Sequence, residues 1–272
     1  MLYGIDVSNW NSPKKETYRD ADFMIHKATE GKSFVDKTMN QHVGEYNTNR
    51  YAVPDKEPLL GFYHFAQPIT GNTVASEAEN FLKAVKKYVG DAIFALDLES
   101  GNQTFVDWAL EWLNYVYEKT GVKALVYSSA SNLKLFKEIQ SADYGLWVAN
   151  YKRNGNHFPV VKPETIGPWD YLAIWQWSNG QTPHSASQGW FDDNIDQNVF
   201  NGDAKDWKMY CYSSTVIDKS TLPWKPIDYI MVAYDVMNGH YGCGKERIQK
   251  LTQAGFNPQK VQDIINLAHK EG

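Results

Sequence analysis

The segment Ala92-Ile93-Phe94-Ala95-Leu96-Asp97-Leu98-Glu99 decides the fold expected for this chain, because an apolar run of strand length ends in two acidic residues. A continuous apolar run of this length is typical of a strand buried on both faces of a parallel sheet. Side chains alternate along a strand, so Asp97 and Glu99 share one face, opposite the leucines. The segment therefore predicts a buried strand that presents two carboxyl groups at its end.

Seven other segments repeat this pattern of a short apolar or β-branched run followed by turn residues. The eight expected strands span residues 2–7, 23–28, 59–65, 92–99, 122–127, 146–151, 172–177 and 195–200. Their spacing is typical of a β/α barrel, in which each strand is followed by a helix.

Helical patterns separate the first six strands. Residues 76–89 carry apolar side chains at spacings of three and four, with Ser76 as the expected N-cap, and residues 104–120 do the same before Gly121. After Tyr151 the spacers are rich in Pro, Gly, Asn and Ser, which predicts loops. The expected fold class is α/β, a TIM-like barrel of five βα units plus three strands, in a domain of residues 1–205.

The C-terminal part of the chain has a different pattern. Residues 206–226 contain two prolines and a Ser-Ser-Thr run, which predicts a linker. Residues 227–272 show three amphipathic stretches, and Pro258 is an expected first residue of the last of them. The sequence therefore predicts a small three-helix domain after the barrel.

Composition excludes several classes of function. A net charge of −5 without a basic run argues against nucleic acid, and no apolar run is long enough to span a membrane. Two cysteines without a CxxC pair, and the absence of HExxH or clustered His and Cys, predict neither a disulfide framework nor a metal site. No nucleotide-binding loop follows a strand, so no cofactor is expected.

Acidic residues at strand ends are the best candidates for chemistry, because a barrel of parallel strands carries its active site at the carboxyl edge. Asp6 ends the first expected strand, Asp97 and Glu99 end the fourth, and Asp196 lies in the eighth. Glycoside hydrolysis needs one protonated and one ionised carboxyl group in a single site. A single acid at a loop boundary is more often a cap or a solvated turn, so the prediction depends on the whole group.

Eight segments taken together resemble the family 25 glycoside hydrolases, the lysozyme family of many phage endolysins and bacterial lytic enzymes. The resemblance covers about residues 2–202. The matching segments are GIDVSNW (4–10), HKATEG (26–31), GFYHF (61–65), ALDLE (95–99), LVYSS (125–129), LWVANY (146–151), IWQWS (174–178) and IDQNVF (195–200).

The resemblance implies a role for each acid. Glu99 is expected to protonate the β-1,4 oxygen between N-acetylmuramic acid and N-acetylglucosamine. Asp97 is expected either to stabilise the positive charge that develops on the sugar or to orient the substrate's N-acetyl group. Asp6 and Asp196 are expected to position the sugar and to tune this pair.

Four aromatic residues near strand ends are further candidates under the same resemblance. They are expected to bind the glycan through ring faces and hydroxyl groups, with barrel packing as an equally good interpretation of each one. These residues are Tyr63, Tyr127, Tyr151 and Trp175. His26 and His64, which fall within expected strands, are predicted to be packed core residues and not bases.

The run VMNGHYGCGKERIQKLTQAGFNPQKVQDIIN, residues 236–266, resembles a short cell-wall-binding repeat of the kind found in a pneumococcal phage lysozyme. The resemblance implies a muropeptide as the partner of the C-terminal module. Only one copy is present, so tandem repeats cannot supply avidity within one chain.

These expectations combine into a peptidoglycan hydrolase, a lysozyme of the N-acetylmuramidase type that is encoded by a phage or prophage for host lysis. The N-terminus shows no signal-peptide pattern, so the protein is expected to be made in the host cytoplasm and to reach the wall with the help of a holin. Two alternatives stay open at this point: a non-catalytic glycan-binding barrel and a chitin-type glycosidase. The oligomeric state also stays open.

Overall fold

The computed structural model describes most of the chain. The described residues are 2–68, 71–99, 102–151, 166–170, 172–180, 194–211, 232, 236–237, 241–253, 256 and 258–268. The chain divides into two compact units, Met1–Val216 and Ile217–Gly272, which are described separately below.

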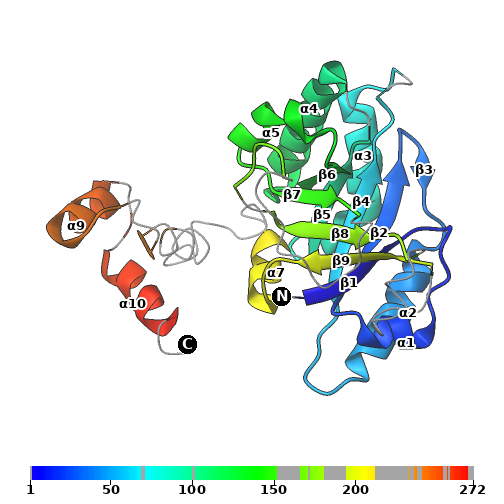
Figure 1. Cartoon of the computed structure of the whole chain (residues 1–272), viewed down its shortest axis with the longest axis horizontal. Coiled ribbons are helices and arrows are strands. Elements are labelled where there is room, and N and C mark those ends of the chain that lie inside the picture. Colours follow the sequence, from blue (N-terminus) through cyan, green and yellow to red (C-terminus); the bar gives the residue numbers. More distant parts are fainter. Residues whose placement is uncertain are drawn as a thin grey trace. The chain divides into compact units, whose positions relative to one another are not determined.

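The first unit is a closed barrel of eight strands (Figure 1). The barrel strands are β1 (Leu2–Val7), β2 (Phe23–Glu30), β4 (Leu59–Phe65), β5 (Ala92–Asp97), β6 (Leu125–Ser129), β7 (Leu146–Ala149), β8 (Ile174–Ser178) and β9 (Asp196–Phe200). The barrel closes because β1 pairs with β2 on one side and with β9 on the other. A short strand, β3 (Phe34–Val35), pairs antiparallel with β2 at the edge of the barrel.

All eight predicted strands are confirmed, and the last one runs in the opposite direction to the others. The other seven barrel strands run parallel to one another, whereas β9 is antiparallel to both of its neighbours, β8 and β1. The start of β9 therefore lies at the edge where the other barrel strands end. This direction matters for the site because Asp196 is the first residue of β9.

Five helices occupy the connections between the first six barrel strands, which confirms the five predicted βα units. They are α1 (Lys15–Asp20), α2 (Met39–Tyr51), α3 (Val74–Val85), α4 (Gln103–Thr120) and α5 (Lys137–Ser141). Short 3-10 turns, η2 (Lys86–Tyr88) and η3 (Leu133–Leu135), accompany α3 and α5. Figure 1 shows α3, α4 and α5 along one side of the barrel and α1 with α2 along another.

The helix ends follow ordinary capping rules, with one correction. Gly121 ends α4 in the left-handed conformation, with φ of 74°, as predicted. The N-cap of α3 is Thr73 and not Ser76, because the Thr73 side chain accepts a hydrogen bond from the Ser76 backbone N–H at 3.2 Å. The connections that were predicted as loops, before β8 and before β9, lie largely outside the described residues.

Two apolar clusters divide the barrel unit. The larger one lies between the strands and helices, and the smaller one fills the barrel interior. The interior cluster is closed by α7 (Ala204–Cys211). The centre of the Trp207 ring lies 4.6 Å from the centre of the Phe23 ring and 5.1 Å from the centre of the Phe200 ring. Because Phe23 begins β2 and Phe200 ends the antiparallel β9, α7 plugs the amino edge and leaves the carboxyl edge open.

Helix α7 also corrects the predicted linker. Residues 206–211 were assigned to the linker, yet they are helical and Trp207 is buried. The sequence pattern missed this helix because it is only about two turns long, too short for a clear helical period. The rest of the predicted linker lies outside the described residues.

The second unit contains helices α9 (Gly244–Gln253) and α10 (Pro258–Ala268). Pro258 opens α10, as predicted. Residues 232, 236 and 237 are also helical, and the rest of the first predicted helix lies outside the described residues. The core of this unit consists of Val232, Val236, Leu251, Val261 and Ile265. Among the described residues of the whole chain, no helix is both long and apolar enough to cross a membrane.

Candidate active site

Four acidic residues gather at the open carboxyl edge of the barrel. Asp6 is directly opposite Asp196 in the pairing of β1 with β9, and Asp97 is the last residue of β5. Glu99 follows two residues later and is exposed, whereas Asp6 and Asp97 are buried. The four predicted acids therefore lie at one rim. Asp196 reaches this rim because β9 is antiparallel and begins there.

The acids at this rim act on one another electrostatically. Burial raises the pKa of Asp97 well above its ordinary value, and the charges of Glu99 and Asp6 raise it further. Burial also raises the pKa of Asp196 to about 8, again with help from Asp6 and Glu99. The rim therefore retains protons at neutral pH, and these protons belong to the group of acids and not to one residue alone.

Asp6 is held by two amide side chains. Gln176 Nε2 and Asn198 Nδ2 donate hydrogen bonds to Asp6 Oδ2 at 2.8 and 2.6 Å. Burial raises the pKa of Asp6 to about 6, and these two hydrogen bonds oppose the rise. Two hydrogen bonds therefore fix the Asp6 carboxyl group at the rim.

Gln176 also joins Asp6 to two of the predicted aromatic residues. Its Oε1 accepts hydrogen bonds from the hydroxyl groups of Tyr127 and Tyr151, at 2.9 and 2.6 Å. Asn198 is fixed in a similar way, because its Oδ1 accepts a hydrogen bond from Trp147 Nε1 at 2.8 Å. These contacts form a polar layer directly below the rim.

The backbone at Glu99 is tied to the neighbouring strand. Asn132 Nδ2 donates to the Glu99 carbonyl at 3.0 Å, and Ser128 Oγ donates to the Leu98 carbonyl at 2.6 Å. The Leu98 N–H donates to the Tyr127 carbonyl at 3.0 Å. The main chain that carries Glu99 is therefore fixed, while its side chain faces solvent, where a substrate can reach it.

The predicted aromatic residues divide into two groups. Tyr63, Tyr127 and Tyr151 lie at the site: burial raises the pKa of each, and the nearby acids add to the effect. Trp175 does not lie there. It is buried in the outer cluster, and its Nε1 donates to the Asn150 carbonyl at 3.0 Å.

The position of Trp175 corrects the prediction and has a simple cause. Neighbouring residues of a strand point to opposite faces, so once Gln176 faces the barrel interior, Trp175 must face the helices. Gln176 and Asn198 were missed as site residues. A signal was present for Gln176, which is an uncharged polar residue between two tryptophans of a mostly apolar strand, whereas Asn198 follows two other polar residues and does not stand out.

Both strand histidines are packed core residues, as predicted. His64 Nε2 lies 2.8 Å from Glu77 Oε2 and its Nδ1 lies 2.7 Å from Thr29 Oγ1. His26 Nε2 lies 2.9 Å from His42 Nδ1. Among the described residues, no group of three or more His, Cys, Asp or Glu side chains is arranged to hold a metal ion.

Models of two protein families match this chain. The model described as glycosyl hydrolases family 25 matches residues 5–185, and the model described as CW_7 repeat matches residues 231–268. The two matches fall in different compact units, Met1–Val216 and Ile217–Gly272. The two family models therefore match different parts of the chain.

Among curated proteins, the chain is similar to the lysozyme of Streptococcus phage Cp-7, with 27% identity over 252 residues that cover 89% of this chain and 62% of the relative. It is also 27% identical over 224 residues to the uncharacterised protein YegX of Escherichia coli K12, and the match covers 77% of this chain and 73% of the relative.

Among solved structures, a family GH25 lysozyme from Aspergillus fumigatus superimposes with a TM-score of 0.61 at 22% identity, covering 78% of this chain and 99% of that chain. The CTP1L endolysin superimposes with a TM-score of 0.52 at 28% identity, and the match covers 78% of this chain and 69% of that chain. These likenesses agree with the barrel fold described above.

Proposed function

Because this chain belongs to glycosyl hydrolases family 25, we propose that it is a lysozyme, an N-acetylmuramidase that hydrolyses the β-1,4 bond between N-acetylmuramic acid and N-acetylglucosamine in peptidoglycan. One observation carries the proposal. Asp97 and Glu99 lie at one open rim with Asp6 and Asp196, and burial together with mutual repulsion holds protons in this group at neutral pH. Glycoside hydrolysis needs this combination of neutral and ionised carboxyl groups.

Glu99 is the proton donor in this proposal. Two like charges two residues apart at the end of β5 disfavour double ionisation, so the Asp97–Glu99 pair holds one proton. Glu99 is the exposed member, and the glycosidic oxygen of a bound strand can reach it. In the reaction, Glu99 transfers its proton to this oxygen as the glycosidic bond breaks.

Asp97 carries the negative charge during the reaction. Once the proton is on Glu99, the Asp97 carboxylate either stabilises the positive charge that develops on the sugar carbon or orients the N-acetyl group of the substrate. Asp6 and Asp196, with Gln176, position the sugar. Tyr63, Tyr127 and Tyr151 lie around this group and present rings and hydroxyl groups to the glycan.

The proposal is tested by the release of soluble fragments from purified peptidoglycan. Glu99→Gln keeps the shape of the side chain but cannot donate the proton, so we expect the rate to fall about 10³-fold. The matched control is Glu111→Gln, an exposed residue of α4, which should act like the wild type. Activity that survives in Glu99→Gln would remove Glu99 from the role of acid.

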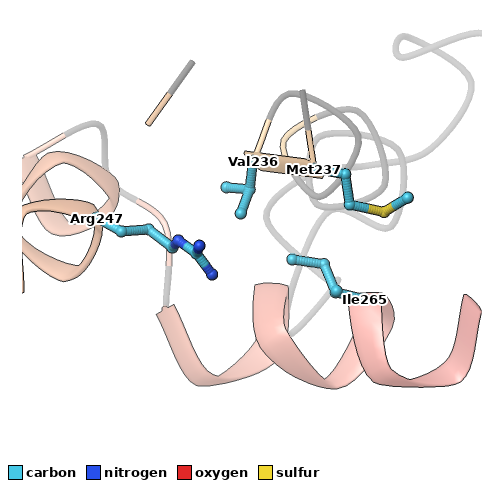
Figure 2. Close-up of a pocket in the computed structure, with 4 residues that line it drawn as sticks. All are labelled: Val236, Met237, Arg247 and Ile265. Atoms are coloured by element: carbon cyan, nitrogen blue, oxygen red, sulfur yellow. The ribbon is translucent and has the colours of Figure 1, made fainter. Parts of the chain in front are cut away.

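We propose that the C-terminal module, residues 227–272, binds the muropeptide part of the wall, while the barrel together with α7, residues 1–211, forms the catalytic domain. A cavity of about 350 Å³ in this module is lined by Val236, Met237, Arg247 and Ile265 (Figure 2). Arg247 Nη1 donates to Gln262 Oε1 at 3.3 Å and Nε donates to the Gly242 carbonyl at 3.2 Å, which fixes the guanidinium at the cavity. A fixed guanidinium beside apolar side chains suits a peptide that carries carboxylates and methyl groups.

Sedimentation with purified cell walls tests this assignment in the full chain. Arg247→Met should lower the bound fraction, whereas Lys245→Met, an exposed residue of the same helix, should leave it unchanged. Equal binding by the two variants would contradict the role of Arg247.

We further propose that the enzyme is a phage or prophage endolysin that reaches the wall with the help of a holin. The similarity to a phage lysozyme and to an endolysin supports this role. Expression inside a susceptible bacterium should cause lysis only when a holin is expressed as well. Lysis without a holin would contradict the proposed route.

A further inference from the structure

A lysine that the mechanism above does not use lies beside the acidic rim. Lys27, on β2, is only 8% exposed, and its Nζ forms an ion pair with Glu30 Oε2 at 2.5 Å. The same Nζ lies 4.9 Å from the centre of the Phe65 ring. Phe65 is paired in register with Asp97 on the adjoining strand. The ammonium group is therefore next to the strand end that carries Asp97.

The partner of this lysine is itself fixed. Glu30 Oε1 accepts a hydrogen bond from Gln67 Nε2 at 3.0 Å. The Gln67 backbone N–H donates to Glu77 Oε2 at 3.0 Å, and Glu77 is hydrogen-bonded to His64 behind β4. A line of contacts thus runs from the buried outer cluster to the rim, and it holds the Glu30 carboxylate and with it the Lys27 ammonium.

Asp97 has little else to stabilise its charge. Among the described residues, its Oδ1 is buried with no hydrogen-bond partner. Burial raises the pKa of Asp97, and the charges of Glu99, Asp6 and, to a smaller extent, Glu30 raise it further, whereas the charge of Lys27 lowers it. The charged and titratable groups that face Asp97 are Glu99 on its own segment, Asp6 on β1, Lys27 and Glu30 on β2, Tyr63 on β4, Tyr127 on β6 and Tyr151 after β7.

We propose that Lys27 is a positioning residue for the hydrolysis, and that its ammonium, held by Glu30 and Gln67, favours the carboxylate form of Asp97 while Glu99 carries the proton. This inference rests on the proposed function. Lys27 acts through Asp97 and does not contact the substrate. At the end of β5, the cation therefore lies beside the buried acid, Asp97, and the proton is carried by the exposed acid, Glu99.

The pH dependence of peptidoglycan hydrolysis tests this role. In Lys27→Met, Asp97 loses the cation that favours its charge, so we expect the acidic limb of kcat/KM to move up by about one pH unit. Lys27→Arg retains the charge and should keep the limb near its original position. Lys32→Met, an exposed residue just after β2, is the matched control. Thermal unfolding of each variant shows that the comparison is made on folded protein.

Two outcomes of this experiment would overturn the inference. An unchanged acidic limb in Lys27→Met would show that the lysine does not set the charge of Asp97. A shift of the alkaline limb instead would show that Lys27 acts on the proton donor. In either case Glu99→Gln still abolishes hydrolysis if the proposed function holds, so the two failures are distinguishable.

A second measurement does not depend on turnover. Carboxyl carbon resonances of aspartate can be followed by NMR during a pH titration, with the Asp97 signal assigned by its loss in Asp97→Asn. We expect the midpoint for Asp97 to be higher in Lys27→Met than in the wild type by about one pH unit. Equal midpoints would overturn the inference even if the protein hydrolysed no peptidoglycan.

Discussion

Two acids on opposite faces of the barrel wall show how differently this protein treats buried acidic side chains. Glu77 of α3 lies behind β4 and is fully buried, and hydrogen bonds from His64, the Gln67 N–H and Asn72 reach both of its oxygens. Asp97 lies inside the barrel, where one of its oxygens is buried without a partner among the described residues. Burial acts against the charge of both acids, yet the hydrogen bonds leave the pKa of Glu77 lowered, while that of Asp97 is raised.

This difference separates a structural acid from a catalytic one. A buried carboxylate whose oxygens are satisfied stabilises the fold, because its removal leaves the donors around it unpaired. A buried carboxyl group that lacks partners destabilises the folded state, and such strain is typical of sites where a substrate completes the set of interactions. Glu77 in the outer cluster therefore stabilises the barrel, whereas Asp97 at the rim lowers the stability of the folded state and is available for the reaction.

The largest expected effect separates activity from stability at Asp97. Asp97→Asn removes the charge but keeps the shape, so we expect hydrolysis to fall by about 10²–10³-fold. The same variant should melt about 2–4 °C above the wild type, because a buried acidic group with an unpaired oxygen has been removed. Asp107→Asn, at an exposed position of α4, should change neither quantity. A lower Tm for Asp97→Asn would contradict the comparison.

The opposite pattern is expected at Glu77. In Glu77→Gln an amide N–H faces donors from His64, Gln67 or Asn72, which should cost about 2–3 kcal/mol of unfolding free energy and about 5–10 °C in Tm. Activity at low temperature should fall by less than about tenfold, well short of the loss in Asp97→Asn. Glu79→Gln, an exposed change on the same helix, is the control. A variant that melts like the wild type would remove Glu77 from the structural role.

The two regions should also respond to pH with opposite signs. The pKa of Asp196 is raised to about 8 in the folded protein, so the folded state binds more protons than the unfolded chain and loses stability as the pH rises from about 4 to about 8. Glu77, whose pKa is lowered, loses its contribution as the pH falls through its folded value. In Asp196→Asn the fall in Tm between about pH 5 and pH 8 should shrink by about 3 °C. An unchanged slope in calorimetry would contradict this account of the rim.

The smallest expected effect concerns binding at the edge of the rim. Trp10 follows β1 and is 86% exposed, so its ring is available to a sugar face. Trp10→Ala should raise KM for peptidoglycan about 5–10-fold with little change in kcat or Tm. Tyr51→Ala removes a ring that is 67% exposed at the end of α2, toward the amino edge, and should leave KM unchanged. Equal KM values for the two variants would exclude Trp10 from the binding surface.

Much of the barrel could be predicted from the sequence because its strands are short apolar runs between clear turn residues. The run that ends in Asp97 and Glu99 forms a strand with Asp97 facing the interior, and Asp6 was correctly placed at a strand end. Local patterns were sufficient here because the period of side chains along a strand decides which residues share a face.

The remaining features depend on contacts between distant residues. The direction of β9 follows from pairing with β1 and β8, and alternation along residues 195–200 is the same in either direction. Gln176 and Trp175 are neighbours in a mostly apolar strand, so the sequence did not reveal which of them faces the interior. Helix α7 was missed because its role, closing the amino edge with Trp207, appears only once the barrel is formed.

The most direct test of the central claim is the identity of the ends that the enzyme releases. Purified peptidoglycan is digested with the wild type, the new reducing ends are reduced with borohydride, and the fragments are identified by mass spectrometry. A muramidase produces N-acetylmuramic acid at these ends, and we predict that they are absent from a parallel digest with Glu99→Gln. Reducing ends of N-acetylglucosamine in the wild-type digest would contradict the proposed bond specificity, and a digest without new ends would contradict a catalytic rim.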